Sequence, residues 1–307
     1  MRNFERSLPY WPYRTYNWGR WPDDRGTLNL LGPATTRRAL ESVDSHETFA
    51  LGAPLRADDA GLDAQAFSLD MLHAGKYDFG PTTEPVQAAS DRVCVSIHGM
   101  TNSHIDALCH AGHRGLSFNG SEFEANVRKG EPARRFTIME MPSLVTRAWF
   151  VDVPRLRGLD ALRPGTPVVP EDLAWLDGRV EPGDAVVVRT GRYATRVVRP
   201  DDPEAGDDHG NWSGLHVDCM EQVSAWDLST VATDSSGDNF PSTTSECSVP
   251  IHILTEVYLG LPLVHHLDLE ELGRRMRDRS NNAFMLMIAP LRVVGGTGSP
   301  VSPVAVI

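Results

Sequence analysis

Four short runs rich in apolar and β-branched residues constrain the fold of this chain more than any other feature. They cover residues 148–153, 184–190, 229–233 and 284–290. Runs of this length, bounded by turn residues, are typical of buried strands. A further strand is expected over 92–98, where Val93, Val95 and Ile97 alternate with polar residues. The chain therefore predicts a sheet assembled from short strands that lie far apart in the sequence.

Helix signals lie between these strands. The segments that carry them are 33–42, 170–176, 215–225, 250–259 and the residues from 268 onward. Proline stands at the start of the first two segments, where its missing N–H costs nothing. Asp268 and Glu271 resemble a capping box that opens the last helix. Because strands and helices are mixed without strict alternation, we expect one α/β domain over residues 1–307 with a mixed central sheet.

The first 32 residues form an aromatic-rich N-terminal segment. Its aromatic residues include Tyr10, Trp11, Tyr13, Tyr16, Trp18 and Trp21. A disordered tail would contain fewer aromatic residues. The segment is therefore expected to pack on the core, on a neighbouring subunit or beside a ligand pocket.

Charge and composition exclude several classes of partner. The chain has 29 Lys and Arg against 41 Asp and Glu, a formal net charge of −12. This balance argues against nucleic acid and anionic membranes as partners. The four cysteines contain no Cys-x-x-Cys pair, which argues against a cysteine zinc site. The beginning has no apolar signal core, and no apolar run is long enough to span a bilayer, so we expect a cytoplasmic protein.

Three histidines and an aspartate gather in one short segment. His98, His104, Asp106 and His110 lie within 13 residues. His104 and Asp106 are two residues apart, so in an extended segment they point to the same side. Imidazole and carboxylate are ligands for zinc and manganese. Single histidines are usually ordinary structural residues, but this cluster favours a metal site, with His110 as a proton-transfer group.

The cluster resembles a family signature. The segment His104-Ile-Asp-Ala-Leu-Cys-His110 matches the second half of His-x-Gly-Thr-His-x-Asp-x-Pro-x-His. Further similar stretches cover residues 17–31, 183–191, 214–220 and 289–300. On these residues the chain resembles the cyclase superfamily that includes bacterial kynurenine formamidase and isatin hydrolase, in a longer, actinobacterial-type branch. The resemblance implies a swivelling β/β/α domain, usually in homo-oligomers, so we expect a homodimer or homotetramer.

The resemblance also implies roles for individual residues. His104 and Asp106 fall on metal ligands, and His110 falls on the catalytic histidine. His252 matches a later ligand, while His265 stands where the formamidase branch has a glutamate.

The chain departs from the signature at its first histidine. Met100 occupies that position, and His98 lies two residues earlier on the same expected strand face. His98 is expected either to replace that ligand or to contact substrate. Because imidazole at His265 cannot bridge two ions as a carboxylate does, we expect one divalent ion, Zn or Mn, per chain.

The leading hypothesis is a metal-dependent hydrolase. It would cleave an amide or lactone bond in a small cyclic or aromatic substrate with metal-activated water. Trp18, Trp21 and Met100 are candidates for the substrate-binding wall, although the tryptophans fit a subunit interface equally well. The alternatives are a metal-assisted cyclase or dehydratase of secondary metabolism and a non-catalytic small-molecule binding protein.

Three other residues near these motifs carry weaker hypotheses. Cys109 beside His110 suggests a nucleophile, but a buried packing residue is favoured. Asp234 and Asp238 follow the predicted strand at 229–233 and either line the pocket or cap a turn.

Overall fold

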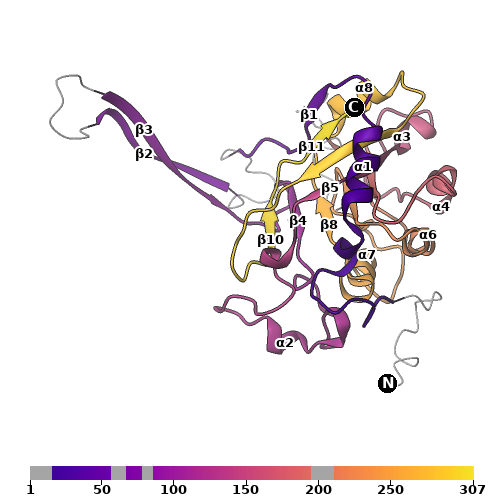
Figure 1. Ribbon diagram of the computed structural model, residues 1–307, viewed down its shortest axis with the longest axis horizontal. Coiled ribbons are helices and arrows are strands. Elements are labelled where there is room, and N and C mark those ends of the chain that lie inside the picture. The colour runs from indigo at the N-terminus through magenta and orange to yellow at the C-terminus, as the bar shows by residue number, and fades with distance from the viewer. Residues whose placement is uncertain (1–15, 57–66, 78–85, 195–210) are drawn as a thin grey trace.

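A nine-stranded mixed sheet organises the chain in the computed structural model (Figure 1). The structure describes residues 16–56, 67–77, 86–194 and 211–307, so Tyr10, Trp11 and Tyr13 lie outside the described residues. The strand order is β1-β11-β9-β5-β6-β7-β8-β4-β10. Strands β5 to β8 run parallel, and the pairs on either side of them are antiparallel. The expected α/β class with a mixed central sheet is confirmed.

The expected strands form close to their predicted positions. The strands of the sheet are β1 (Thr48–Ala50), β4 (His104–Asp106), β5 (Leu144–Asp152), β6 (Ala185–Arg189), β7 (Thr230–Thr233), β8 (Leu263–His265), β9 (Ala283–Ile288), β10 (Gly298–Pro300) and β11 (Val304–Val306). All four of the predicted apolar runs form strands. A strand that is apolar on both sides is stable where both faces of its sheet are covered.

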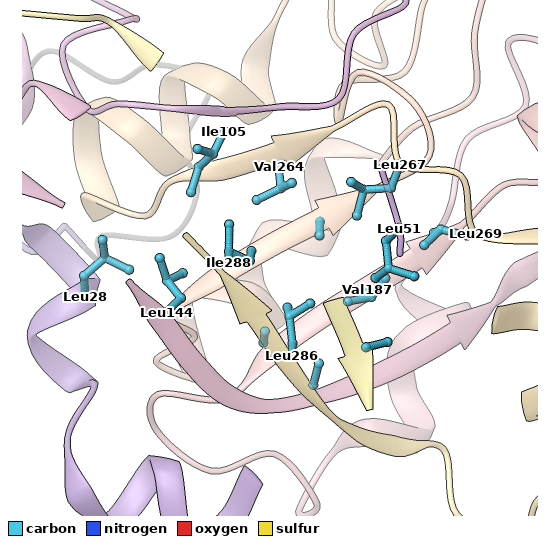
Figure 2. Close-up of a cluster of buried hydrophobic side chains, with 14 of the residues drawn as sticks. Leu28, Leu51, Ile105, Leu144, Val187, Val264, Leu267, Leu269, Leu286 and Ile288 are labelled. Carbon is cyan, nitrogen blue, oxygen red and sulfur yellow. The ribbon is translucent and has the colours of Figure 1, made fainter. Parts of the chain in front are cut away.

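Side chains from the central strands enter two separate cores. In β6, Val186 and Val188 pack into one cluster with the helices, while Ala185 and Val187 pack into the other. Successive residues of a strand point to opposite faces, so this division means that both faces of the sheet are buried. Figure 2 shows the second cluster, which contains Ile105 of β4 and Ile288 of β9.

Short helices cover the sheet. They are η1 (Gly26–Leu30), α1 (Pro33–Glu41), η2 (Phe118–Gly120), α2 (Phe123–Asn126), η3 (Ile138–Glu140), α3 (Val153–Leu156), α4 (Pro170–Leu173), η4 (Ala174–Leu176), η5 (Val217–Cys219), α6 (Met220–Ala225), α7 (Pro250–His252), η6 (Ile253–Leu259) and α8 (Glu270–Met276). Within the described ranges, no helix is both long enough and apolar enough to cross a bilayer.

Two of the helix predictions differ from the structure in detail. The helix expected over 250–259 is a short α-helix that continues as the π-helix η6. The prediction of a capping box at Asp268 is wrong. Leu269 is the N-cap residue of α8. Asp268 instead accepts a hydrogen bond from the backbone N–H of Glu270. Glu271 instead pairs with Arg274 on the helix surface.

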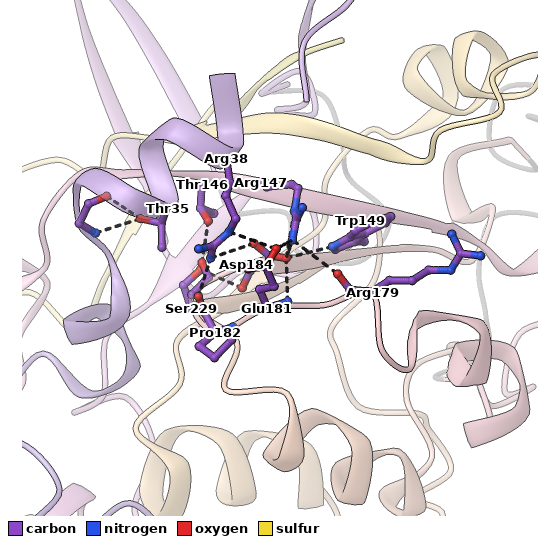
Figure 3. A network of polar contacts seen from close by, with 12 residues as sticks. Thr35, Arg38, Thr146, Arg147, Trp149, Arg179, Glu181, Pro182, Asp184 and Ser229 are labelled. Atoms are coloured by element: carbon purple, nitrogen blue, oxygen red, sulfur yellow. Dashed lines mark hydrogen bonds and ion pairs between the residues drawn. The ribbon is translucent and has the colours of Figure 1, made fainter. Parts of the chain in front are cut away.

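A buried carboxylate joins α1 to the sheet (Figure 3). Asp184 is fully buried and accepts hydrogen bonds from Arg147 at 2.7 Å and from the indole N–H of Trp149 at 3.0 Å. Arg38 of α1 reaches the same carboxylate at 3.3 Å. A buried charge is tolerated only when it is paired in this way, so the network has a structural role.

Strands β2 (Phe67–Tyr77) and β3 (Val86–Val95) form a separate two-stranded ribbon that projects from the body, which we call the arm (Figure 1). The strand predicted over 92–98 therefore ends at Val95, and His98 lies in a turn. The placement of His98 on a strand face was wrong because the chain leaves the ribbon at Ser96 to enter the body.

The described part of the N-terminal segment packs on the end of η6. The backbone N–H of Asn17 donates to the carbonyl of Tyr258, and the indole N–H of Trp18 donates to that of Val257 at 2.6 Å. The Trp18 ring also stacks on Tyr258 with centroids 5.5 Å apart. These contacts satisfy carbonyls that a helix end leaves without partners.

Candidate metal centre

The pairing of β4 with β8 explains why two ligand candidates on β4, His104 and Asp106, lie close to a third on β8, His265. His104 lies opposite His265 of β8 in the antiparallel register. His104 and Asp106 are separated by one residue, so their side chains emerge on the same face of the strand. Directly opposed residues have side chains within reach of each other, and the rings of His104 and His265 have centroids 5.1 Å apart.

His98 completes a first group of ligand atoms with His104 and Asp106. Its Nδ1 lies 2.7 Å from Oδ1 of Asp106, and its Nε2 lies 2.9 Å from the hydroxyl of Thr297. Both Nδ1 of His98 and Oδ1 of Asp106 are buried, and neither forms a hydrogen bond of acceptable geometry within the described ranges. Because neither atom is engaged in a hydrogen bond, both can act, together with His104, as ligands of one cation.

The neighbours of His104 orient its ring toward the same point. Its Nδ1 lies 2.7 Å from the carbonyl oxygen of Asn102, a group that can only accept a hydrogen bond. Nδ1 therefore carries the proton, and Nε2 presents its lone pair 3.5 Å from Oδ1 of Asp106. Burial lowers the pKa of His104 to about 4, so the ring is neutral at neutral pH, as a metal ligand must be.

A second group of ligand atoms shares the other oxygen of Asp106. Nε2 of His265 lies 2.7 Å from Oδ2 of Asp106, and Nε2 of His252 lies 3.7 Å from it. His252 is oriented by Asp238, which accepts a hydrogen bond from its Nδ1 at 2.5 Å. Asp238 also accepts a hydrogen bond from the backbone N–H of Ile251 at 2.7 Å. The same carboxylate therefore caps the start of α7 and positions the imidazole of His252.

Asp106 is the residue common to both groups. Its side chain is fully buried between the imidazoles. Burial alone would raise the pKa of Asp106, but His265 and His104 hold it well below its usual range. The carboxylate is therefore ionised and offers one oxygen to each group.

His110 lies beside the first group without belonging to it. Its ring stacks on that of His98, with centroids 3.7 Å apart and planes 12° from parallel. Burial lowers the pKa of His110 to about 4. A neutral imidazole at this position can accept a proton at neutral pH.

Sequence reasoning missed Glu256, a buried carboxyl group in the π-helix η6. Its Oε2 accepts a hydrogen bond from the backbone N–H of Ala111, the residue after His110. Burial and the nearby carboxylate of Asp106 raise the pKa of Glu256 well above its usual range. The spacing His252-x-x-x-Glu256 was the available signal, since positions i and i+4 share a helix face. π-Helical turns occur often at functional sites.

Two of the weaker candidates, Cys109 and Asp234, take structural positions, and His266, the neighbour of His265, points to a different partner. Cys109 is fully buried and its pKa is raised to about 12 by burial, which fits a packing residue. Asp234 caps the turn after β6 by accepting from the backbone N–H groups of Thr190 and Gly191. His266 turns toward Arg192, with Nδ1 2.7 Å from the guanidinium.

The three residues predicted to line the substrate pocket, Trp18, Trp21 and Met100, lie in three different environments. Trp18 is half-buried against η6, as described above. Trp21 is half-buried against the second core cluster, with the guanidinium of Arg20 4.6 Å from its ring centre. Met100 is half-buried in the loop between the turn of His98 and β4. Their contact with a substrate stays a prediction.

Comparison with known families identifies the chain at the level of its family. The family model described as "Putative cyclase" matches residues 4–237, well over half of the chain. The chain belongs to this cyclase family. The crystal structure of a novel cyclase is 25% identical, with a TM-score of 0.81, and the match covers 95% of this chain and 99% of that one.

Two isatin hydrolases share the cyclase-family fold. One, bound to the product analogue thioisatinate, is 16% identical with a TM-score of 0.56, and the match covers 90% of this chain and 99% of that one. Isatin hydrolase A from Labrenzia aggregata, bound to benzyl benzoate, is 18% identical with a TM-score of 0.55, and the match covers 87% and 94%. A comparison with curated proteins finds no significant match.

Proposed function

We propose that the chain is a cytoplasmic metal-dependent hydrolase that cleaves an amide or lactone bond in a small cyclic or aromatic molecule. The observation that carries the proposal is the pair of unsatisfied ligand atoms, Nδ1 of His98 and Oδ1 of Asp106, beside the neutral ring of His110. Membership of the cyclase family and the fold shared with isatin hydrolases support it.

One Zn or Mn ion per chain would be held by His98, His104 and Asp106. These residues offer two imidazole nitrogens and one carboxylate oxygen, a donor set that suits either metal. The second group is the less suitable holder, because Nε2 of His265 forms a hydrogen bond with Oδ2 of Asp106, whereas Nδ1 of His98 and Oδ1 of Asp106 form none among the described residues. A bound ion supplies hydroxide at neutral pH by lowering the pKa of a water molecule toward about 7.

The residues of the chain supply the proton transfer and the orientation. Neutral His110 takes the proton from the attacking water and returns it to the leaving group. Its stacking on His98 holds it in contact with a ligand ring. Trp18, Trp21 and Met100 would form the apolar wall against the substrate.

The test is a metal count followed by product analysis. Plasma mass spectrometry of the purified protein should find about one Zn or Mn per chain, and two would indicate that the second group is also occupied. Amide and lactone substrates are then turned over in ¹⁸O-labelled water. Incorporation of ¹⁸O into the product supports hydrolysis, whereas a product that gains no water contradicts it and favours a cyclase or dehydratase. A protein that neither contains nor takes up metal contradicts the proposal as a whole.

A further inference from the structure

The carboxyl end of β5 lies beside the start of β9, because the two strands pair antiparallel. The helices that follow β5 and the helix that precedes β9 cover opposite faces of the sheet. Val153 of α3 and Leu176 of η4 belong to one core cluster, whereas Leu272 and Met276 of α8 belong to the second cluster. Segments that leave a sheet toward opposite faces open a crevice between them, and small molecules bind in such crevices at the carboxyl ends of strands.

A cavity of about 430 Å³ lies in this crevice, and its volume is within the range of small-molecule sites. Its buried lining is apolar. Phe150 and Met276 are buried there, and the ring of Trp175 is held edge-on against Trp149 with centroids 6.3 Å apart. Leu156, which is 54% exposed, lies at the rim. Strands β6, β7 and β8 lie between β5 and β4 in the sheet, so the cavity is separate from the candidate metal centre.

Several polar groups of the lining are hydrogen-bond donors without a partner. The indole N–H of Trp175 and the Nε–H of Arg279 are buried, and neither forms a hydrogen bond within the described part of the chain. The guanidinium of Arg155 is exposed and forms no ion pair with any described residue. Indole and guanidinium groups can only donate hydrogen bonds, and a buried donor without a partner costs free energy. A ligand that satisfies these groups must therefore offer acceptor oxygens.

The charge of the cavity favours an anion. Among the described residues that line it, Asp152 has the only carboxylate, and its Oδ1 accepts from Arg189 at 2.8 Å and from the backbone N–H of Arg155 at 3.3 Å. Arg279 is neutralised by Asp44 at 2.6 Å. Arg155 therefore leaves a local positive charge beside the cavity, in a chain whose net charge is −12. Arginine pairs with carboxylates through two parallel hydrogen bonds.

We propose that this cavity is a second small-molecule site, which binds a planar aromatic carboxylate. The carboxylate pairs with Arg155 and accepts the indole N–H of Trp175, while the ring packs on the apolar lining at Phe150 and Met276. Phosphate or a short aliphatic acid would satisfy the donors but would leave the apolar lining uncovered. Selectivity therefore comes from the charge and the ring together, and the site requires neither a metal nor the proposed hydrolysis.

Isothermal titration calorimetry of the full chain with 2-naphthoate tests the site, and 2-naphthamide is the matched neutral probe. We expect one 2-naphthoate per chain with a Kd below about 1 mM, and binding of the amide that is at least about tenfold weaker. The titration is repeated after a chelator has removed metal, because carboxylates also bind metal ions, and an unchanged Kd supports the proposal. Binding that is absent, that disappears with the metal or that is equally strong for the amide overturns it.

Two pairs of variants locate the bound probe. Arg155→Gln should weaken binding of 2-naphthoate at least about tenfold, whereas Arg37→Gln, at another exposed arginine, should leave the Kd unchanged. Trp175→Phe keeps an aromatic ring but removes the N–H, and should weaken binding about threefold or more. Trp212→Phe is its control, because it also removes a buried N–H without a partner among the described residues, but outside this cavity.

Nuclear magnetic resonance of the indole N–H groups gives an independent readout. One indole resonance of the wild type should shift when 2-naphthoate is added, and it should be the resonance that is missing from Trp175→Phe. Wild-type affinity in Arg155→Gln, or a shifting resonance that persists in Trp175→Phe, would place the probe elsewhere and overturn the proposal. Because these measurements need no turnover, they can fail or succeed independently of the proposed hydrolysis.

Discussion

Nδ1 of His252 donates a hydrogen bond to Oδ2 of Asp238 across 2.5 Å, and this bond fixes which nitrogen of the ring is free. Nε2 is left with its lone pair facing Asp106. Asp238 also accepts backbone N–H groups from Ile251 and His252, so its own position is fixed by the start of α7. Carboxylates behind ligand histidines raise their basicity and hold their rings in place.

Asp238→Asn tests this relationship. Asparagine keeps an acceptor for the start of α7 but loses the charge that supports His252. If His252 contributes to metal binding, the affinity for Zn or Mn should fall by about 10–100-fold, measured by competition with a chelator dye. Asp268→Asn is a matched control, because Asp268 also accepts a backbone N–H at a helix start. Equal affinities in the two variants would confine the ion to the first group, His98, His104 and Asp106.

His98 and Met100 can be separated by a double variant. His98→Gln should lose most of the bound metal, because it removes the nitrogen 2.7 Å from Asp106. Met100→His alone should leave metal content unchanged, since His98 already supplies a ligand. Combining the two substitutions should restore part of the metal if the family position remains usable. Full metal content in His98→Gln, measured by plasma mass spectrometry, would show that His98 is not a ligand.

His110→Ala separates catalysis from metal binding. The variant should keep its metal, because His110 belongs to neither ligand group. The rate should fall by at least about a hundredfold with loss of the acid–base group. Metal content and steady-state kinetics are measured on the same sample. Near-normal kcat at full metal content would exclude His110 as the proton-transfer residue.

The buried histidines predict a pH dependence of stability. Burial lowers the pKa of both His104 and His110 to about 4, whereas an unfolded histidine titrates near 6.5. Between these values the unfolded forms of these two side chains bind more protons than the folded forms, so both histidines lower the free energy of unfolding as pH decreases. Urea unfolding with a chelator present measures the slope, and His110→Gln should reduce it by up to about one proton. An unchanged slope would show that His110 is accessible to protons in the folded state.

The raised pKa of Glu256 predicts that the free energy of unfolding changes with pH in the opposite direction. Burial and Asp106 raise its pKa, so the folded chain holds a proton that the unfolded chain releases. The stability contributed by the protonated group is lost as pH rises through the folded pKa. Glu256→Gln cannot ionise, so its stability relative to the wild type should increase with pH in the metal-free protein. Glu221→Gln, at an exposed position of α6, is the control and should show no such trend.

The sequence predicted the elements whose signals are local. The strands at β5, β6, β7 and β9 were found because apolar runs of this kind have few other stable environments. The arm was mostly missed, since the alternation at Val93, Val95 and Ile97 does not show where a ribbon leaves the body. His98 was placed on a strand for that reason, although the structure puts it in a turn.

The site residues also differ in whether a local sequence signal predicted them. His98, His104, Asp106 and His110 are close in sequence, so their spacing could be interpreted directly. His252 and His265 were reached only through the family resemblance. The support from Asp238 depends on how the start of α7 packs against the loop after β7. The proximity of Glu256 depends on how η6 packs against the loop after β4, and no local pattern encodes either packing.

The position of β4 in the sheet has a consequence for biosynthesis. Its two neighbours are β8 and β10, and Asp106 meets His265 across 159 residues of sequence. Strand β10 leaves the ribosome after every other strand except β11. Contacts between such distant segments form slowly, because a long loop must close before they can form. The pocket around Asp106 is therefore complete only after the end of translation, unlike a zinc finger, whose metal drives folding of a short segment.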